Sequence, residues 1–395
     1  MKQGWEIKKI KDIASLITDG DWIESRHQSE DGIRLIQTGN VGNGVFKAKD
    51  DKPHYISEDT FNELGCTEIF ARDCLVSRLP EPVGRACIIP EISHRMITAV
   101  DCSIIRFKDV YLSKLFVYYT MSLSYQKDIN NNTTGTTRKR ISRKNLEQIP
   151  IPIPPLPEQE RIVSELDLIS GVIEKKKQQL KELDSLAQSI FYEMFGNPVE
   201  NEKGWEREKL SNKAEISSSK RIFASEYTDS GVPFYRGKEV TEKSKGNPIS
   251  VELYISHERY EEIKLNYGVP DVGDILVTAV GTIGNIWVVD SDEVFYFKDG
   301  NVLWIKIKDG TNPIYFKYIL TILINEYKDM MANGCAYSAL TIANLKEMPT
   351  CVIPLSLQQE FASKIEKIEK QKELIKQSLQ DTETLFDSRM DFYFN

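Results

Sequence analysis

The stretch that decides the fold is "IPIPPLPEQERI" at residues 151–162, where a proline-rich run passes directly into a helix-like segment. A second stretch, "VIPLSLQQEFAS" at 352–363, makes the same change about 200 residues later. Proline fixes φ and disfavours helix in the residue before it, so each stretch predicts a stiff elbow between a strand and a helix. The second copy has fewer prolines, and Gln359 and Glu360 are expected to preserve its helix start.

The two elbows belong to a repeat that runs through the whole chain. "GWEIKKI" at 4–10 returns as "GWEREKL" at 204–210, and "DCLVSRLPEPVGRACII" at 73–89 returns as "GDILVTAVGTIGNIWVV" at 273–289. The blocks keep their order and a spacing close to 200 residues. Self-similarity of this kind predicts two copies of one structural unit, each a globular domain followed by a long helix.

Each globular domain is predicted to have an α/β fold. Short runs rich in β-branched and aromatic residues are interrupted by Gly, Pro and Asn, which is typical of strands and turns. One apolar helix is expected in each copy, at 111–129 and at 313–331. The predicted division of the chain is 1–156 and 196–355 for the globular domains, and 157–195 and 356–390 for the long helices.

Both predicted long helices carry one apolar stripe. Apolar residues recur in alternating steps of four and three, with Lys176 in one missing place, and this is heptad spacing. One such helix cannot bury its stripe alone. We therefore expect an antiparallel coiled coil within the chain, with the two domains related by a pseudo-twofold axis; dimerisation with a second copy is the alternative. The predicted coiled-coil contacts are Ile162, Leu166, Ile169, Ile173, Leu180, Leu183, Ile190, Phe361, Ile365, Ile368, Ile375 and Leu379.

Composition places the chain among soluble globular proteins. Its 395 residues favour two or three domains, and no window offers the roughly 18 apolar residues of a membrane helix. The N-terminal segment lacks the apolar core of a signal peptide, and the six cysteines form no C-x-x-C pair. We therefore expect a cytoplasmic protein with reduced thiols.

Motif searches give no catalytic or metal-binding constellation. The chain has no P-loop, no H-E-x-x-H, no G-x-S-x-G and no zinc spacing among its four histidines. The glycine-rich "GNVGNG" at 39–44 is interpreted as a turn. The net charge is −8, and residues 1–156 balance 22 Lys and Arg against 20 Asp and Glu. Uniform positive charge is therefore not the basis of any binding to nucleic acid.

The order of these motifs resembles one known family. The proline elbow, the heptad helix and then "FGNPVENEKGWE" at 195–206, leading into a second copy, resemble the specificity subunit of Type I restriction-modification systems. The resemblance implies two target-recognition domains that each read one half of a split DNA sequence, and helices that set the spacing between the halves. It also implies binding to two adenine methyltransferase subunits, joined by restriction subunits that translocate and cut DNA.

The same resemblance implies that the chain itself is not catalytic. S-adenosylmethionine, ATP and Mg would belong to partner subunits, and no cofactor or metal is expected in this chain. Two other functions stay open. One is a coiled-coil scaffold with two interaction heads and no DNA, and the other is an enzyme with a site shared between two repeats. The scaffold does not explain the repeated proline elbow or the basic and threonine-rich run near residue 138, and the enzyme lacks any catalytic motif.

Three segments are candidates for contact with DNA, because Arg and Lys bind phosphates and Arg, Gln and Asn bind base edges. The first is the run "NNNTTGTTRKRISRKN", for which a solvated turn is the alternative, with its counterpart in the second copy. The second is the loop "RLPEPVGR", for which a tight hairpin is the alternative, and the third follows an early strand. The residues proposed are Thr136, Thr137, Arg138, Lys139, Arg140, Arg143, Lys144, Tyr337 and Ser338; Arg78 and Arg85; and Gln37, Asn40, Arg236 and Lys238.

Overall fold

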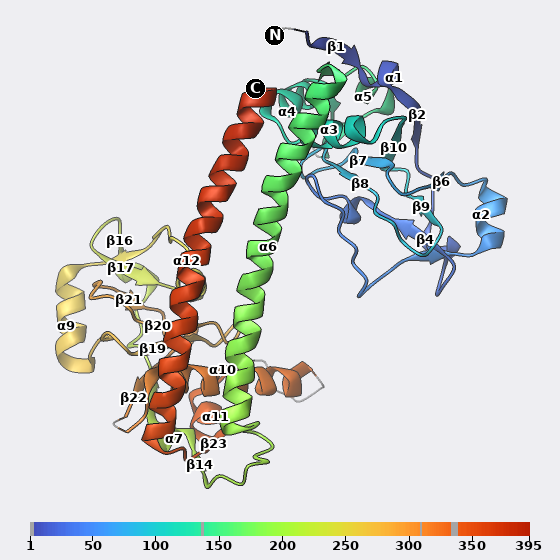
Figure 1. Ribbon diagram of the computed structural model, residues 1–395. Coiled ribbons are helices and arrows are strands. Elements are labelled where there is room, and N and C mark those ends of the chain that lie inside the picture. The colour runs from blue at the N-terminus through green and yellow to red at the C-terminus, as the bar shows by residue number, and fades with distance from the viewer. Residues whose placement is uncertain (1–3, 136–137, 309, 333–338) are drawn as a thin grey trace. The chain divides into compact units, whose positions relative to one another are not determined.

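The computed structural model describes residues 4–135, 138–308, 310–332 and 339–395 (Figure 1). The chain forms two compact units, one made of Met1–Gln178 with Lys376–Asn395 and the other of Gln179–Ile375. The long helices α6 (Leu156–Phe195) and α12 (Leu355–Phe394) each contribute one half to unit 1 and one half to unit 2. Each unit is therefore a globular part together with two half-helices.

Unit 1 is built on two main sheets. A four-stranded antiparallel sheet has the order β2-β10-β7-β8, and a five-stranded sheet has the order β3-β5-β4-β9-β6, in which β4 and β9 are parallel. Two short pairs, β1-β13 and β11-β12, complete the strands. The strands are β1 (Glu6–Lys9), β2 (Ala14–Asp19), β3 (Gln28–Ser29), β4 (Ile33–Ile36), β5 (Tyr55–Ile56), β6 (Glu68–Ile69), β7 (Cys74–Ser77), β8 (Ala86–Ile88), β9 (Met96–Thr98), β10 (Cys102–Phe107), β11 (Thr133–Thr134), β12 (Arg140–Ile141) and β13 (Pro150–Ile153).

Unit 2 repeats this plan, as the sequence predicts. Its antiparallel sheet β15-β22-β19-β20 matches β2-β10-β7-β8 strand for strand, and β16-β18-β17-β21 matches the second sheet without a partner for β6. The pair β14-β23 corresponds to β1-β13. The strands are β14 (Arg207–Lys209), β15 (Ala214–Ser218), β16 (Tyr227–Thr228), β17 (Val232–Tyr235), β18 (Tyr254–Ile255), β19 (Ile275–Thr278), β20 (Ile286–Val288), β21 (Tyr296–Phe297), β22 (Val302–Ile307) and β23 (Pro349–Cys351).

The apolar helix of each copy differs between the units. In unit 1 the single helix that the sequence predicts is divided into two helices, α3 (Val110–Thr120) and α4 (Leu123–Asn131). Ser122 lies between them, and its hydroxyl caps α4 by accepting a hydrogen bond from the Tyr125 amide. In unit 2 α10 (Pro313–Ala332) is continuous. The other helical segments are α1 (Ile10–Ile13), α2 (Glu58–Leu64), α5 (Arg143–Leu146), α7 (Leu210–Lys213), α8 (Gly237–Ser244), α9 (His257–Tyr267), α11 (Ile342–Glu347), and the 3₁₀ turns η1 (Ser25–His27), η2 (Thr38–Asn40) and η3 (Ala224–Glu226).

A buried glutamine holds each elbow between strand and long helix. The Gln159 side-chain amide donates to the Pro154 carbonyl at 2.8 Å, and the Gln358 amide donates to the Ile353 carbonyl at 2.7 Å. Both side chains are buried. These bonds satisfy a carbonyl that the turn into the helix leaves without a strand partner. The expectation that Gln359 preserves the second helix start is therefore wrong by one residue, since the structural counterpart of Gln159 is Gln358.

In unit 1 the first half of α6 runs antiparallel to the last half of α12. Ile162 and Leu166 are buried in one core cluster with Met390, Tyr393 and Phe394. Further along, the Lys176 ammonium donates to the hydroxyls of Ser378 and Thr382 at 2.7 and 2.6 Å, so a polar contact occupies the missing apolar place. The line of contact between the two long helices is called the seam. Of the residues predicted to lie in the seam of this unit, Ile169 and Ile173 are also buried and Leu379 is half-buried.

In unit 2 the second half of α6 lies against the first half of α12. Aromatic rings fill this part of the seam: Phe361 lies 5.6 Å from Phe191 and 5.3 Å from Phe195, measured between ring centroids. Lys372 pairs with Asp184 across the helices at 2.7 Å. The predicted seam residues Ile365 and Ile368 are buried, and Leu180, Leu183, Ile190 and Ile375 are half-buried.

Two matched substitutions test the seam. Leu166 in unit 1 and Ile365 in unit 2 occupy the same place in the two helices, and both are buried. We expect Leu166→Ala and Ile365→Ala each to lower the unfolding free energy of its own unit by about 2–5 kcal/mol, because each opens a cavity in a packed core. Hydrogen exchange of peptides from each unit measures this. An equal fall in protection of both units from either change would contradict the assignment.

Candidate nucleic-acid interface

The three segments proposed separately in unit 1 lie next to one another. The Ile141 amide in β12 donates to the Arg78 carbonyl at 3.2 Å, which joins the basic run to the loop between β7 and β8. The Arg85 guanidinium donates to the Thr38 carbonyl at 2.9 Å and to the Val41 carbonyl at 2.7 Å, which joins that loop to the segment after β4. The segments therefore form one surface, although about 100 residues separate the first from the last.

Arg78 and Arg85 brace this surface from inside. Arg85 also donates to the Leu79 and Pro82 carbonyls, and only 8% of the residue is exposed. Arg78 is 5% exposed and forms an ion pair with Asp19. Burial lowers the pKa of both guanidinium groups. Their donors are turned to carbonyls and a carboxylate of the protein, so contact of either arginine with DNA would have to replace these partners, and it stays a prediction.

The basic run itself is open to solvent. Arg138 and Lys139 are exposed between β11 and β12. Arg140 pairs with Asp101 at 3.0 Å, and Arg143 pairs with Glu147 at 3.3 Å at the end of α5. Lys144 is exposed on the same short helix, which Ser142 caps by accepting from the Asn145 amide. Thr136 and Thr137 lie outside the described residues.

Asn40 and Gln37 have different surroundings. The Asn40 carboxamide is buried: its oxygen accepts from the Gln37 backbone amide at 2.9 Å, and its nitrogen donates to the Lys47 carbonyl at 2.8 Å. The Asn40 side chain thus closes the turn η2, and a base contact by Asn40 would have to replace these bonds and stays a prediction. The Gln37 side chain is half-buried and lines a cavity of about 290 Å³.

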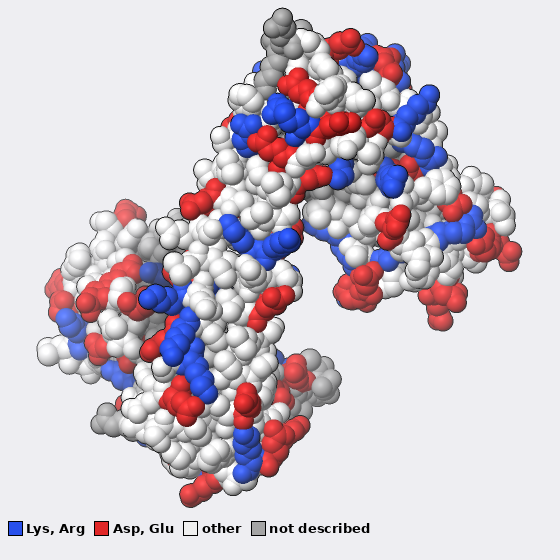
Figure 2. All heavy atoms as spheres, viewed as in Figure 1, with Lys and Arg blue, Asp and Glu red and all other residues white. Residues whose placement is uncertain are grey.

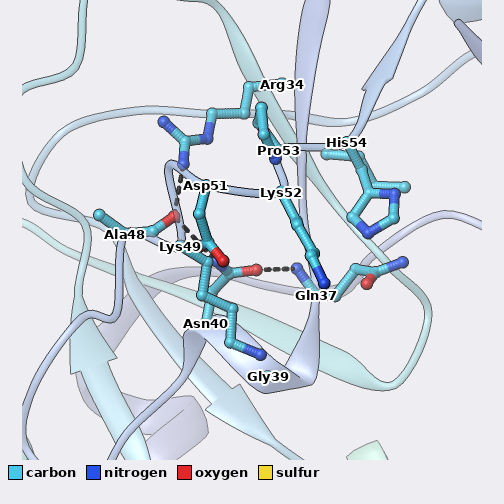
Figure 3. Close-up of a pocket in the computed structure, with 11 residues that line it drawn as sticks. Arg34, Gln37, Gly39, Asn40, Ala48, Lys49, Asp51, Lys52, Pro53 and His54 are labelled. Carbon is cyan, nitrogen blue, oxygen red and sulfur yellow. Dashed lines mark hydrogen bonds between the residues drawn. The ribbon is translucent and has the colours of Figure 1, made fainter. Parts of the chain in front are cut away.

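Two lysines that the sequence analysis missed line the same cavity. Figure 3 shows the Lys49 and Lys52 side chains extending toward the segment 37–39. A Cβ placed on Gly39 would lie 2.6 Å from the Lys49 ammonium nitrogen, so glycine leaves room for this approach. Asp51 also lines the cavity, and Arg34 is paired with Asp50. In the sequence "KAKDDK" at 47–52, two aspartates stand between Lys49 and Lys52. The segment therefore has no run of positive charge that would mark it as a DNA contact.

Unit 2 also joins the equivalent segments, by one equivalent backbone bond and one different side-chain bond. The Leu340 amide donates to the Ala279 carbonyl at 3.0 Å, and the Asn285 side chain donates to the Thr241 hydroxyl in α8 at 2.9 Å. Asn285 thus stands where Arg85 stands in unit 1. The same three-segment surface is present in both units with different side chains. Tyr337 and Ser338 lie outside the described residues.

The two cations proposed in unit 2 are already paired. Arg236 contacts Glu239 at 2.9 Å and Glu252 at 2.7 Å, and Lys238 contacts Glu252 at 2.7 Å. Hydrogen bonds from Lys238 and Arg236 lower the pKa of Glu252 to about 2. Contact of either cation with DNA would have to replace these carboxylates, and it stays a prediction.

Charge is mixed over both units. Figure 2 shows Lys and Arg interspersed with Asp and Glu on the face in view, among the described residues of each unit. Within the described part of the chain, no group of three or more His, Cys, Asp or Glu side chains could hold a metal ion. No described helix is long and apolar enough to cross a membrane. The five described cysteines are buried free thiols, and burial raises the pKa of Cys87 to about 12.

A repeated α/β unit with a long helix after each copy defines a known class of DNA-specificity proteins. The family model described as "Type I restriction modification DNA specificity domain" matches residues 2–185 and 202–384. The chain belongs to this family. The expected resemblance is confirmed, and so is the fold of two α/β domains separated by long helices.

The comparisons with particular proteins agree with this family. The chain is 29% identical to the putative type I restriction enzyme specificity subunit S.HindORF215P of Haemophilus influenzae, over 60% of either chain. It is 21% identical to the putative MjaX specificity subunit of Methanocaldococcus jannaschii, over 93% of this chain and 87% of that protein. The crystal structure of the S subunit from M. genitalium matches with a TM-score of 0.54 and 14% identity over 99% of this chain and 97% of that one. The match thus spans about 60% of the length of the Haemophilus relative, and the solved structure supports the fold.

Replacing Arg85 tests its structural role. We expect Arg85→Met to lower the unfolding free energy of unit 1 by about 3 kcal/mol, because four carbonyls lose the guanidinium as a donor and two of them, those of Val41 and Leu79, belong to buried residues. Urea unfolding followed by hydrogen exchange of unit 1 peptides measures this. Arg143→Met is the matched control, since its exposed side chain should contribute less than about 0.5 kcal/mol. Equal stability of the two variants would remove the structural assignment.

Proposed function

We propose that this chain is the non-catalytic DNA-recognition subunit of a Type I restriction-modification complex. The observation that carries the proposal is the surface present in both units, in which the same three segments are joined by one equivalent backbone bond and by a side chain from the same position, Arg85 or Asn285. In this proposal the domains 1–156 and 196–355 each read one half of a split DNA sequence. Because the two surfaces differ, the two half-sites should differ, whereas identical surfaces would suit a palindrome.

Phosphate and base contacts in unit 1 are assigned to different residues. Arg138, Lys139 and the cavity lysines Lys49 and Lys52 are exposed cations, which suits them to phosphates. Gln37 lies beside the cavity lysines and carries an amide that can bind a base edge on both its donor and its acceptor. The other residues proposed to contact DNA are Arg140, Arg143, Lys144, Arg236, Lys238, Thr136, Thr137, Tyr337 and Ser338.

The long helices are assigned to partner binding and spacing. Leu186 on α6 in unit 2 and Leu385 on α12 in unit 1 occupy the same place in the repeat, and they are 47% and 50% exposed. Repeat-related apolar residues in both units suit two copies of one partner, the methyltransferase subunit. Restriction subunits would join that assembly. S-adenosylmethionine, ATP and Mg belong to those partners, this chain needs no cofactor, and the complex acts in the cytoplasm.

A methylation map tests the function. The chain is co-expressed with the methyltransferase subunit encoded beside it, and methylated adenines are located by single-molecule sequencing. We expect one motif of two unlike halves around a fixed gap, and its disappearance when this chain is deleted. Methylation at a continuous site, or methylation that persists without the chain, would leave the scaffold with two interaction heads as the better function.

The basic run can be tested within the same complex. We expect a triple variant, Arg138→Ala with Lys139→Ala and Arg140→Ala, to assemble with the methyltransferase but to lose methylation, because phosphate contacts next to one half-site are removed. The matched control replaces Lys11, Lys108 and Lys127 by Ala, which removes the same charge from exposed positions of unit 1 outside the joined segments. Equal methylation by the two triple variants would remove the basic run from the site.

The cavity lysines predict a change in salt dependence. Removing one phosphate-binding lysine should reduce the slope of log Kobs against log salt by about 1. We therefore expect Lys49→Ala with Lys52→Ala to reduce the slope for the methyltransferase complex by about 2, with little change in the sequence recognised. Fluorescence anisotropy with a duplex that carries the mapped motif measures the slope. An unchanged slope, or the same change from Lys108→Ala with Lys127→Ala, would contradict the phosphate role.

A further inference from the structure

Unit 2 has an open groove between its two half-helices and α10. The groove has a volume of about 710 Å³. Apolar side chains from all three helices line it, and carboxylates stand along its rim. The apolar lining includes Tyr192 from α6, Ile314, Tyr318 and Ile322 from α10, and Ile365 from α12.

The corresponding place in unit 1 can be located residue by residue. Gln159 and Gln358 make the same bond at the starts of α6 and α12, so Ala187 on α6 corresponds to Phe386 on α12. Asp109 and Asn312 cap the starts of α3 and α10 in the same manner, each accepting from the amides two and three residues later. Counting from these caps, Thr321 in unit 2 corresponds to Tyr118 in unit 1, and Lys317 corresponds to Lys114.

Unit 1 fills this place with its own side chains. The Tyr118 ring lies 6.2 Å from the Phe386 ring, measured between centroids, and the Tyr118 hydroxyl donates to Asp167 at 2.7 Å. Lys114 forms an ion pair with the same carboxylate at 2.5 Å. Aromatic packing and a charged hydrogen-bond network therefore close the surface of unit 1.

Unit 2 lacks each of these closing contacts among its described residues. Thr321 and Ala187 are too short to span the space that Tyr118 and Phe386 cover. Lys317 and Glu366, the counterparts of Lys114 and Asp167, make no ion pair within the described part of the chain. The groove is thus a difference between two copies of one fold, in which the side chains that cover this place in unit 1 have no equivalent among the described residues of unit 2.

The charge of the rim indicates what the groove binds. Lys372 is neutralised by Asp184 at 2.7 Å and by Glu369 at 2.9 Å. Three further carboxylates on the rim form no ion pair with described residues, Glu326, Asp329 and Glu366, and they outnumber Lys317, the lining cation that is likewise without an ion pair to a described residue. An apolar groove between helices with an acidic rim is complementary to an amphipathic helix whose polar face is basic.

We propose that this groove binds a basic amphipathic helix of one methyltransferase subunit, and that unit 1 offers no open counterpart. The inference rests on the proposed function, in which two methyltransferase copies bind this chain. It adds that the two copies bind unequally: the copy at unit 2 inserts apolar side chains between α6, α10 and α12, while the copy at unit 1 meets a closed surface.

Hydrogen exchange at one equivalent of methyltransferase tests the order of binding. We expect protection over 313–329 in α10 while 110–120 in α3 still exchanges as in the free chain, and protection of both at saturation. Equal protection of the two helices at one equivalent, or earlier protection of α3, would overturn the inference. If the wild-type chain binds no methyltransferase at all, the proposed function fails together with it.

Two surface variants test the groove itself. Thr321→Tyr places the side chain of unit 1 into the groove, and Asp329→Lys with Glu366→Lys reverses the rim charge; all three positions are exposed. We expect either variant to weaken the tighter methyltransferase copy on the order of tenfold or more, read as the number of copies retained on dilution in native mass spectrometry. Glu200→Lys with Glu373→Lys is the charge-matched control, since both residues are exposed and neither lines the groove. Two copies retained by both groove variants as in the wild type would overturn the groove and leave the function standing.

Discussion

An amphipathic helix must cover its apolar stripe, and this constraint organises each unit. A globular part covers one end of each long helix, but Ile162 and Leu166 in unit 1 and Phe361 and Ile365 in unit 2 also need the other helix. The seam is not uniformly apolar, because Lys176 and Lys372 donate across it to hydroxyls and carboxylates. Such polar contacts permit few alternative registers, since a shifted helix would leave an ammonium in the seam without its partners.

The elbow between strand and long helix fixes the direction in which the globular part joins the helix. The Gln159 and Gln358 amides hold the carbonyls of Pro154 and Ile353, which lie between the last strand and the helix, so strand and helix leave the turn in a fixed direction. Prolines differ between the two elbows, and the glutamine bond is common to both. The hydrogen bond, more than the proline count, is therefore what the two turns of this chain share.

The sequence was enough to predict the repeat, the long helices and the three surface segments, because these depend on local patterns of apolar residues, glycines and charges. It was not enough to assign Arg78, Arg85 and Asn40, which have the residue types of DNA contacts but donate to carbonyls inside unit 1. A polar side chain in a loop has the same sequence signature whether it faces outward or braces the loop. Lys49 and Lys52 were missed for the opposite reason, since Asp50 and Asp51 mask their charge in the sequence, while the fold turns Lys49 toward Gly39 and Lys52 toward Gln37.

The bracing side chains also explain how two diverged surfaces can stand on one fold. In unit 1 a single arginine bonds four carbonyls from two segments, whereas in unit 2 Asn285 reaches Thr241 and the Leu340 amide keeps the remaining link. The backbone links are common to both units, and the side-chain braces are interchangeable. The side chains at the outer edge of the segments, such as Gln37, Arg138 and Lys139, carry none of these links. Under the proposed function, substitution at the outer edge would therefore change what a unit recognises without loosening the surface on which the proposed DNA contacts stand.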